Sequence, residues 1–426
     1  MREMKDSGIE WIGAIPQDWQ LSKIGSLYTQ RNEKVSDKVY QPLSVTMQGI
    51  LPQLATAAKT DDGDNRKLVR VGDFAINSRS DRRGSCGISP LDGSVSLINI
   101  ILTPRTAMHP GYYNWLFHTT LFADEFYKWG HGIVADLWTT RWQEMKSITA
   151  PVPEYAEQER IAAFLDAECA EIDAVLEKTR ASIEEYKKLK QTVITQAVTK
   201  GIRSDRPMKD SGIEWIGDIP GSWEVSSVRY IGQLQNGISK GGEFFGKGFP
   251  FVSYGDVYKN YELPHSVSGL IDTTEDERAT YSVEYGDIFF TRTSETIEEV
   301  GFSCVCKRSI PNATFAGFII RLRPFCADEK ILTDYAKYYF RGEHIRAYLV
   351  KEMNLVTRAS LGQTLLKGMS VIVPPKSAQK EIAEYLDDKC ADIDALVAKK
   401  QQYLTEIENY KKSLIYEYVT GKKEVV

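Results

Sequence analysis

Two nearly identical stretches, MKDSGIEWIGAIPQDW at Met4–Trp19 and MKDSGIEWIGDIPGSW at Met208–Trp223, lie 204 residues apart and differ at only three positions. A second pair, QERIAAFLDAECAEIDAVLEK at Gln158–Lys178 and QKEIAEYLDDKCADIDALVAK at Gln379–Lys399, recurs 221 residues apart. Between these matched ends the two halves of the chain have diverged almost beyond alignment. The sequence therefore predicts a duplicated scaffold that presents two different surfaces in one symmetric frame.

Two long amphipathic helices are predicted where the second repeat begins. From Glu157 to about Lys200, apolar or small residues recur mostly in steps of three or four, and the same register follows Gln379. Prolines precede both segments, and Gly201 and Gly421 follow them, as helix start and stop signals do. A helix of about 44 residues is roughly 65 Å long, and with a single apolar stripe it is not stable alone. We therefore expect each helix to pack on its repeat as a coiled coil.

The segments between the helices have the pattern of mixed α/β domains, so the predicted fold class is α+β. In the first segment, residues 42–47, 68–78 and 96–104 are predicted strands and 112–127 is predicted to be helical. In the second, residues 250–258, 285–293 and 315–324 are predicted strands and 332–349 a helix. The repeated opening motif predicts a tight turn whose tryptophans cap the core.

Composition excludes several protein classes. The longest apolar runs fall far short of the roughly 20 residues that a membrane-spanning helix needs. The six cysteines form no C-x-x-C pair and the five histidines lie far apart, so neither a metal site nor a disulfide framework is expected, and the pattern fits a reducing cytoplasm. A net charge of −5 and a pI near 5.8 argue against binding nucleic acid by bulk electrostatics alone. Any contact with DNA must then use local basic loops.

Motifs of DNA-modifying enzymes are missing from the sequence. There is no glycine-rich turn for adenosylmethionine, no Asn/Asp-Pro-Pro-aromatic loop and no Walker A motif, so no cofactor is expected. Glu185-Tyr186-Lys187 matches the end of a nuclease motif but lies in the middle of a predicted helix, where residues two apart face different directions. The sequence favours a binding protein over a catalyst.

Several polar loops next to predicted strands are candidates for DNA contact, because they carry the donors that bind phosphates and base edges. The densest is Asn77–Ser85, which follows a strand and ends in glycine and serine. A solvated charged loop is the competing interpretation of each. The predicted contact residues are Asn77, Arg79, Ser80, Arg82, Arg83 and Arg141 in the first half, and Gln235, Asn236, Lys240, Arg292, Thr293, Ser294, Thr357 and Arg358 in the second.

The order of these motifs resembles the DNA-specificity subunit of Type I restriction-modification enzymes. The resemblance rests on the repeated I-E-W-I-G-x-I-P-x-x-W opening, the P-x-x-x-x-Q-x-x-I-A-x-x-L-D helix start, the I-D pair in the helix, and the endings Val198–Gly201 and Val419–Gly421. It implies two pseudo-symmetric target-recognition domains, residues 1–153 and 204–373. Conserved helices at 154–203 and 374–426 would join them as an antiparallel coiled coil.

The resemblance also implies a function. Such a subunit is not itself catalytic; each domain binds one half of an asymmetric bipartite site in double-stranded DNA, and the helices act as spacer and docking platform. Two methyltransferase subunits, and through them the motor-nuclease subunits, are the implied partners. Two alternatives remain: a standalone DNA-modifying enzyme, which adenosylmethionine binding would reveal, and a protein- or peptide-recognition scaffold, which would not retard DNA even with a methyltransferase subunit present.

Overall fold

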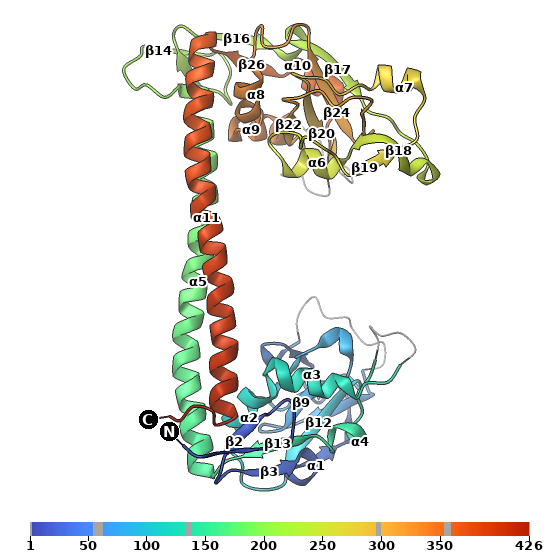
Figure 1. Cartoon of the computed structure of the whole chain (residues 1–426), viewed down its shortest axis with the longest axis vertical. Helices are drawn as coiled ribbons and strands as arrows, with labels where there is room; N and C mark the ends of the chain where they lie inside the picture. The colour runs from blue at the N-terminus through green and yellow to red at the C-terminus, as the bar shows by residue number, and fades with distance from the viewer. Residues whose placement is uncertain (1, 54–62, 133–137, 295–299, 353–358, 426) are drawn as a thin grey trace. The chain divides into compact units, whose positions relative to one another are not determined.

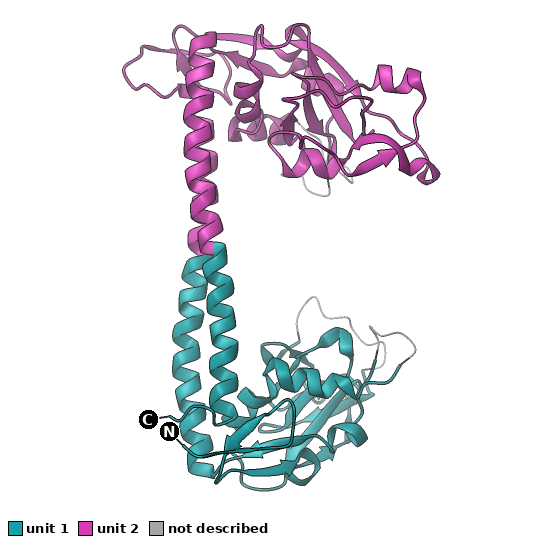
Figure 2. Ribbon diagram, viewed as in Figure 1, with its two compact units in different colours: residues 1–180, 401–426 teal, residues 181–400 magenta. Residues whose placement is uncertain are grey.

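The computed structural model describes residues 2–53, 63–132, 138–294, 300–352 and 359–425 and divides into two compact units (Figures 1 and 2). Unit 1 consists of Met1–Arg180 together with Gln401–Val426, and unit 2 consists of Ala181–Lys400. Each unit combines one globular part with a portion of both long helices. The division therefore cuts across the four segments predicted from the sequence, which remain a prediction about recognition domains.

The long helices, α5 (Tyr155–Lys200) and α11 (Lys376–Val419), pack against each other within both units. In unit 1, Lys411 pairs with Asp173 at 2.6 Å. In unit 2, Lys190 pairs with Asp394 at 2.6 Å. Because early residues of one helix contact late residues of the other, the helices run antiparallel, and the predicted coiled coil is confirmed. Its buried apolar seam consists of Leu165, Cys169, Leu176, Ile183, Leu386, Cys390, Ile393, Leu404 and Leu414.

The globular part of unit 1 is built around a four-stranded antiparallel sheet in the order β10-β9-β12-β4, beside a three-stranded sheet in the order β11-β8-β5. Aromatic side chains from α2 and α3 fill the core; the Phe117 ring lies 4.7 Å from Phe74 and 4.6 Å from Phe122. The elements are β1 (Met4–Asp6), β2 (Ala14–Pro16), β3 (Gln20–Lys23), α1 (Ile24–Leu27), β4 (Tyr28–Arg31), β5 (Lys34–Val35), β6 (Leu43–Thr46), β7 (Gly49–Pro52), β8 (Arg66–Val69), β9 (Phe74–Asn77), η1 (Ser80–Arg82), β10 (Cys86–Ile88), β11 (Gly93–Val95), β12 (Asn99–Pro104), α2 (Pro110–Phe117), α3 (Thr120–Lys128), α4 (Trp142–Met145) and β13 (Thr149–Val152).

Unit 2 repeats this plan, with a four-stranded sheet in the order β22-β20-β24-β17 and a three-stranded sheet in the order β19-β18-β23. The elements are β14 (Met208–Asp210), β15 (Asp218–Pro220), β16 (Glu224–Ser227), η3 (Val228–Tyr230), β17 (Gly232–Asn236), η4 (Gly242–Phe244), β18 (Phe245–Val252), α6 (Tyr254–Lys259), β19 (Gly269–Ile271), α7 (Glu275–Thr280), β20 (Ile288–Thr291), β21 (Thr293–Ser294), β22 (Ser303–Val305), β23 (Thr314–Phe315), β24 (Ile319–Pro324), α8 (Thr333–Tyr339), α9 (Glu343–Glu352), β25 (Ala359–Ser360), α10 (Gln363–Gly368) and β26 (Ser370–Val373). The predicted α+β class with two pseudo-symmetric domains is confirmed.

Each globular part contacts the C-terminal end of the long helix that belongs to the other half of the sequence. In unit 1, the Tyr112 hydroxyl donates to the Val419 carbonyl at 2.8 Å. In unit 2, the Tyr335 hydroxyl donates to the Val198 carbonyl at 3.1 Å. The helices end beside these contacts at Gly201 and Gly421, whose φ angles of 80° and 70° favour glycine. The predicted stop signals are therefore correct.

A buried glutamine closes the start of each long helix. The Gln379 side chain accepts from the Leu332 amide at 2.7 Å and donates to the Lys330 and Pro374 carbonyls, each at 2.8 Å. Gln158 makes the same type of clamp, accepting from the His109 amide at 2.9 Å and donating to the Pro153 carbonyl at 2.8 Å. The P-x-x-x-x-Q motif thus fixes the helix to the segment that precedes the domain's helical pair.

Several of the expected elements differ from the structure. The strand predicted at 250–258 ends at Val252, and α6 follows, because Ser253 accepts from the Asp256 amide and Asp256 accepts from the Ser253 amide in a capping box. The strand predicted at 68–78 is two strands, β8 and β9, separated by a turn in which Gly72 has a φ of 87°. The helices predicted at 112–127 and 332–349 are each a pair of shorter helices.

Candidate nucleic-acid interface

In unit 1, the structure brings the predicted loop and Arg141 to one edge of the four-stranded sheet. Asn77 ends β9, and Arg79, two residues later, forms an isolated bridge with Thr139. The Ser80 amide donates to the Trp138 carbonyl and the Thr140 amide to the Ser78 carbonyl, both at 2.9 Å. The two segments, about 60 residues apart in sequence, therefore form one surface where β9 ends.

Unit 2 has the equivalent edge. After β20, Thr293 pairs with Ser360 as β21 meets β25, and the Leu361 amide donates to the Arg292 carbonyl at 2.7 Å. Asn236, at the end of β17 in the same sheet, joins this edge because its side-chain oxygen accepts from Gln363 at 2.9 Å. Thr357 and Arg358 lie outside the described residues. The predicted residues 292–294 and 236 are thus gathered in one place.

Charge at the unit 1 edge is only partly neutralised by local ion pairs. Asp81 lies 3.2 Å from Arg79 and 3.9 Å from Arg82, and Arg83 pairs with Asp124. Arg82 remains 69% exposed. Among the residues that the structure describes, the exposed Arg141 guanidinium has no carboxylate partner. Arg82 and Arg141 are therefore the side chains best placed to meet a phosphate or a base.

Two of the predicted contact residues in unit 2 make bonds within the domain. Lys240 donates to Glu277 at 2.6 Å and to the Asp272 carbonyl at 2.9 Å, and its side chain is only 14% exposed. The Gln235 side-chain oxygen accepts from Arg321, which is itself buried. Their roles in DNA contact remain predictions, but these bonds would have to break or be shared for either side chain to reach a base.

Exposed aromatic residues next to both edges were missed by sequence reasoning. Phe318, whose carbonyl accepts from the Arg292 amide at 2.9 Å, is 63% exposed. Trp138, bonded through its carbonyl to Ser80, is 38% exposed. Large apolar side chains beside a strand are usually part of a core, so the sequence alone carries no signal that these two face solvent. Their exposure makes them candidates for apolar contact with thymine methyl groups.

Reactive groups are sparse in the described part of the chain. Burial raises the pKa of the Cys306 thiol to about 12, and burial also raises the pKa of Cys86 and Cys304. These thiols are therefore neutral near pH 7. Across the described ranges, no group of three or more His, Cys, Asp or Glu residues is arranged to hold a metal ion. No described helix is long and apolar enough to cross a membrane.

Comparisons with known proteins point to one family. Residues 220–408 match the family model described as the Type I restriction modification DNA specificity domain. The Type I restriction enzyme StySPI specificity subunit of Salmonella potsdam is 24% identical over 276 residues, or 65% of this chain. The EcoKI specificity subunit of Escherichia coli (strain K12) is 23% identical over 284 residues, again 65% of this chain. The matched region spans 58% of the length of either relative.

Solved structures share the fold. A chain from a structure titled for the complex assembly and conformational transition of the type I R-M system superposes with a TM-score of 0.72 at 14% identity, covering 96% of this chain and 99% of that one. The HsdS subunit from Thermoanaerobacter tengcongensis gives a TM-score of 0.50 at 16% identity, covering 96% and 98%. At these identities the likeness concerns the fold, two β-rich domains with two long packed helices.

Proposed function

Because the chain belongs to the specificity subunits of Type I restriction-modification systems, we propose that it selects the DNA site on which such a system acts. In this proposal each globular domain binds one half of a bipartite site in double-stranded DNA. The chain itself carries out no chemistry. The supporting observation is the pair of equivalent sheet edges, which share one strand order but present different side chains.

The difference between the edges implies an asymmetric site. The unit 1 edge offers Arg79, Arg82, Arg83 and Arg141, whereas the unit 2 edge offers Arg292 with Asn236 and Gln363. Guanidinium groups suit guanine edges and phosphates, and side-chain amides suit adenine. The two half-sites would therefore differ in base composition, while cations that contact phosphate fix the register of each domain.

The partners are part of the same proposal. Two methyltransferase subunits would dock on the paired helices. The motor-nuclease subunits would then join the complex, in the cytoplasm, by binding to the methyltransferase subunits. The chain's net charge of −5 supports this dependence, because bulk attraction to phosphate would be weak and partners would supply much of the backbone contact.

A methylome comparison tests the proposal directly. The gene would be expressed with its methyltransferase subunit in a host that lacks other specificity genes, and methylated bases would be mapped. We expect one new asymmetric bipartite motif, which disappears when the gene is omitted. Replacing the domain within residues 20–150 by that of a relative should change one half of the motif only; a change in both halves would refute domain-by-domain recognition.

The alternatives predict other results. A standalone enzyme would bind adenosylmethionine or modify DNA as an isolated chain. A peptide-recognition scaffold would leave the methylome unchanged and fail to retard DNA even with the methyltransferase subunit added.

A further inference from the structure

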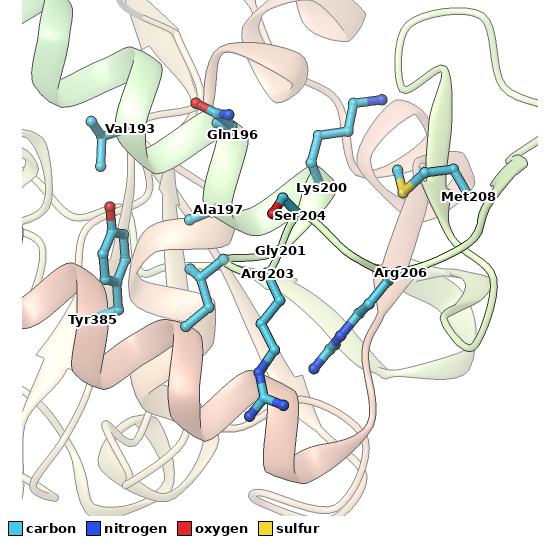
Figure 3. Close-up of a pocket in the computed structure, with 11 residues that line it drawn as sticks. Val193, Gln196, Ala197, Lys200, Gly201, Arg203, Ser204, Arg206, Met208 and Tyr385 are labelled. Carbon is cyan, nitrogen blue, oxygen red and sulfur yellow. The ribbon is translucent and has the colours of Figure 1, made fainter.

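A cavity of about 330 Å³ lies in unit 2 where α5 ends (Figure 3). Val193 and Ala197 of α5 and Tyr385 of α11 form its apolar part. Gln196 and Lys200 of α5 and the linker of residues 201–208 form the rest, with Arg203 and Arg206 directed alongside each other. None of the predicted DNA-contact residues lines it, so the cavity needs a separate explanation.

Comparison of the two repeats explains why the cavity exists. At the offset of 221 residues, Tyr385 corresponds to Phe164 and Ala197 corresponds to Tyr418. In unit 1 the Phe164 and Tyr418 rings pack together, with centroids 4.3 Å apart and planes inclined by 37°. In unit 2, Ala197 has no ring to place over Tyr385. By this sequence correspondence, the cavity lies at the position where unit 1 carries a second aromatic ring.

The rim of the cavity is cationic. Arg203 pairs with Glu381 at 2.7 Å yet remains 54% exposed. Within the described residues, Arg206 has no carboxylate partner. A ring that enters next to these groups is favoured when it carries or adjoins a negative charge, because carboxylates pair with guanidinium groups in two-point geometry.

We propose that this cavity receives an aromatic side chain, flanked by an acidic residue, from the methyltransferase subunit. The inference rests on the function proposed above and adds to it a defined anchor. A buried aromatic anchor ringed by polar contacts is the usual centre of a protein interface. The half-exposed rim favours a side chain presented by a protein surface over a small molecule, whose sites enclose most of the ligand.

The two docking positions on this chain are then unequal. In unit 1 the chain's own Tyr418 ring packs on Phe164 at the equivalent position, so that position is closed to a partner's ring. In unit 2 the cavity is open. Two methyltransferase copies should therefore bind in two resolvable steps, with the tighter step at unit 2.

The test measures binding of purified methyltransferase subunit to the full chain by calorimetry. Ala197→Tyr restores the ring present in unit 1, should raise the melting temperature of unit 2, and should weaken the tighter step about tenfold or more while leaving the other step unchanged. Ala279→Tyr, which adds the same side chain at an exposed position of α7, outside the paired helices, is the matched control and should change neither step. Arg206→Glu reverses charge on the rim without altering the core and should also weaken the tighter step.

The outcomes separate the two proposals. If the wild-type chain does not bind the methyltransferase subunit at all, the proposed function fails, and this inference with it. If both steps are unchanged in Ala197→Tyr and in Arg206→Glu, only this inference is wrong. If 4-hydroxyphenylacetate, added as a probe, stabilises the wild type but not Ala197→Tyr while both steps stay unchanged, the cavity is a small-molecule site instead.

Discussion

Replacing Gln379 with alanine should destabilise unit 2 by an amount that follows from its contacts. The side chain is completely buried and makes three hydrogen bonds of 2.7–2.8 Å to backbone groups of Leu332, Lys330 and Pro374. A net contribution of about 1 kcal/mol per bond gives a loss of roughly 3 kcal/mol in the free energy of unfolding. For a unit of this size, each kcal/mol lowers the melting temperature by about 2–4 °C, so we expect a decrease of roughly 6–12 °C.

Differential scanning calorimetry of the full chain measures this effect, because two units of different stability give separable transitions. Gln158→Ala, which removes two bonds from unit 1, should shift the other transition by about two thirds as much. Gln401→Ala, at an exposed position of α11, is the control and should shift neither. A decrease of less than about 2 °C for Gln379→Ala would show that water or backbone rearrangement replaces the lost bonds and that the clamp is not a stabilising element.

Four further predictions concern DNA recognition and stability. Arg82→Ala and Arg141→Ala should each weaken DNA binding by the assembled complex. An arginine that contacts guanine should cost about 1–3 kcal/mol and relax the base preference, whereas one that contacts phosphate should lower the salt dependence by about one unit. Titrations at several salt concentrations distinguish the two cases, and unchanged binding in both variants would show that the interface lies elsewhere. Phe318→Ala should relax preference at one position of the second half-site, seen as a broadened methylation motif, whereas an unchanged motif removes Phe318 from the interface. Burial lowers the pKa of His344 to about 3, below its unfolded value near 6.5, so unit 2 should lose stability progressively from about pH 6.5 toward pH 3, and His344→Phe should flatten that dependence in melting curves. Inserting seven residues after Arg180 in α5 and seven after Lys400 in α11 lengthens the paired helices by about 10 Å, or roughly 3 bp of DNA. The spacer of the methylated motif should become longer. An active variant that keeps the original spacer would show that the helices do not set its length.

Local patterns were sufficient to predict the parts of the fold that repeat. The helix expected from Glu157 to about Lys200 is α5, Tyr155–Lys200, because one apolar stripe, an upstream proline and a terminal glycine all act within a few residues. The prediction of a strand over 250–258 was wrong because a local helix-start signal was overlooked. There the Ser253–Asp256 capping box starts a helix in a segment whose apolar content fits a strand.

The arrangement of the candidate interface could not be predicted in the same way. Arg79 meets Thr139, and Thr293 meets Ser360, through pairings between segments some 60 residues apart in sequence. Local propensity carries no information about such pairings. Exposure of Phe318 and the internal bonds of Lys240 likewise depend on neighbours from distant strands. Sequence reasoning therefore identified polar and basic loops that the structure brings together at these sheet edges, but not which side chains stay available to a ligand.

Each globular part contacts the end of a long helix from the other half of the sequence, and this has a consequence for biosynthesis. Unit 2 is one continuous stretch, Ala181–Lys400, and every residue it needs has been made before the last helix is finished. Unit 1 begins first on the ribosome, yet Tyr112 finds its partner carbonyl only when Val419 emerges. The first domain to be translated is thus the last to be completed, and until then its aromatic core lacks one wall and is open to chaperones or to aggregation.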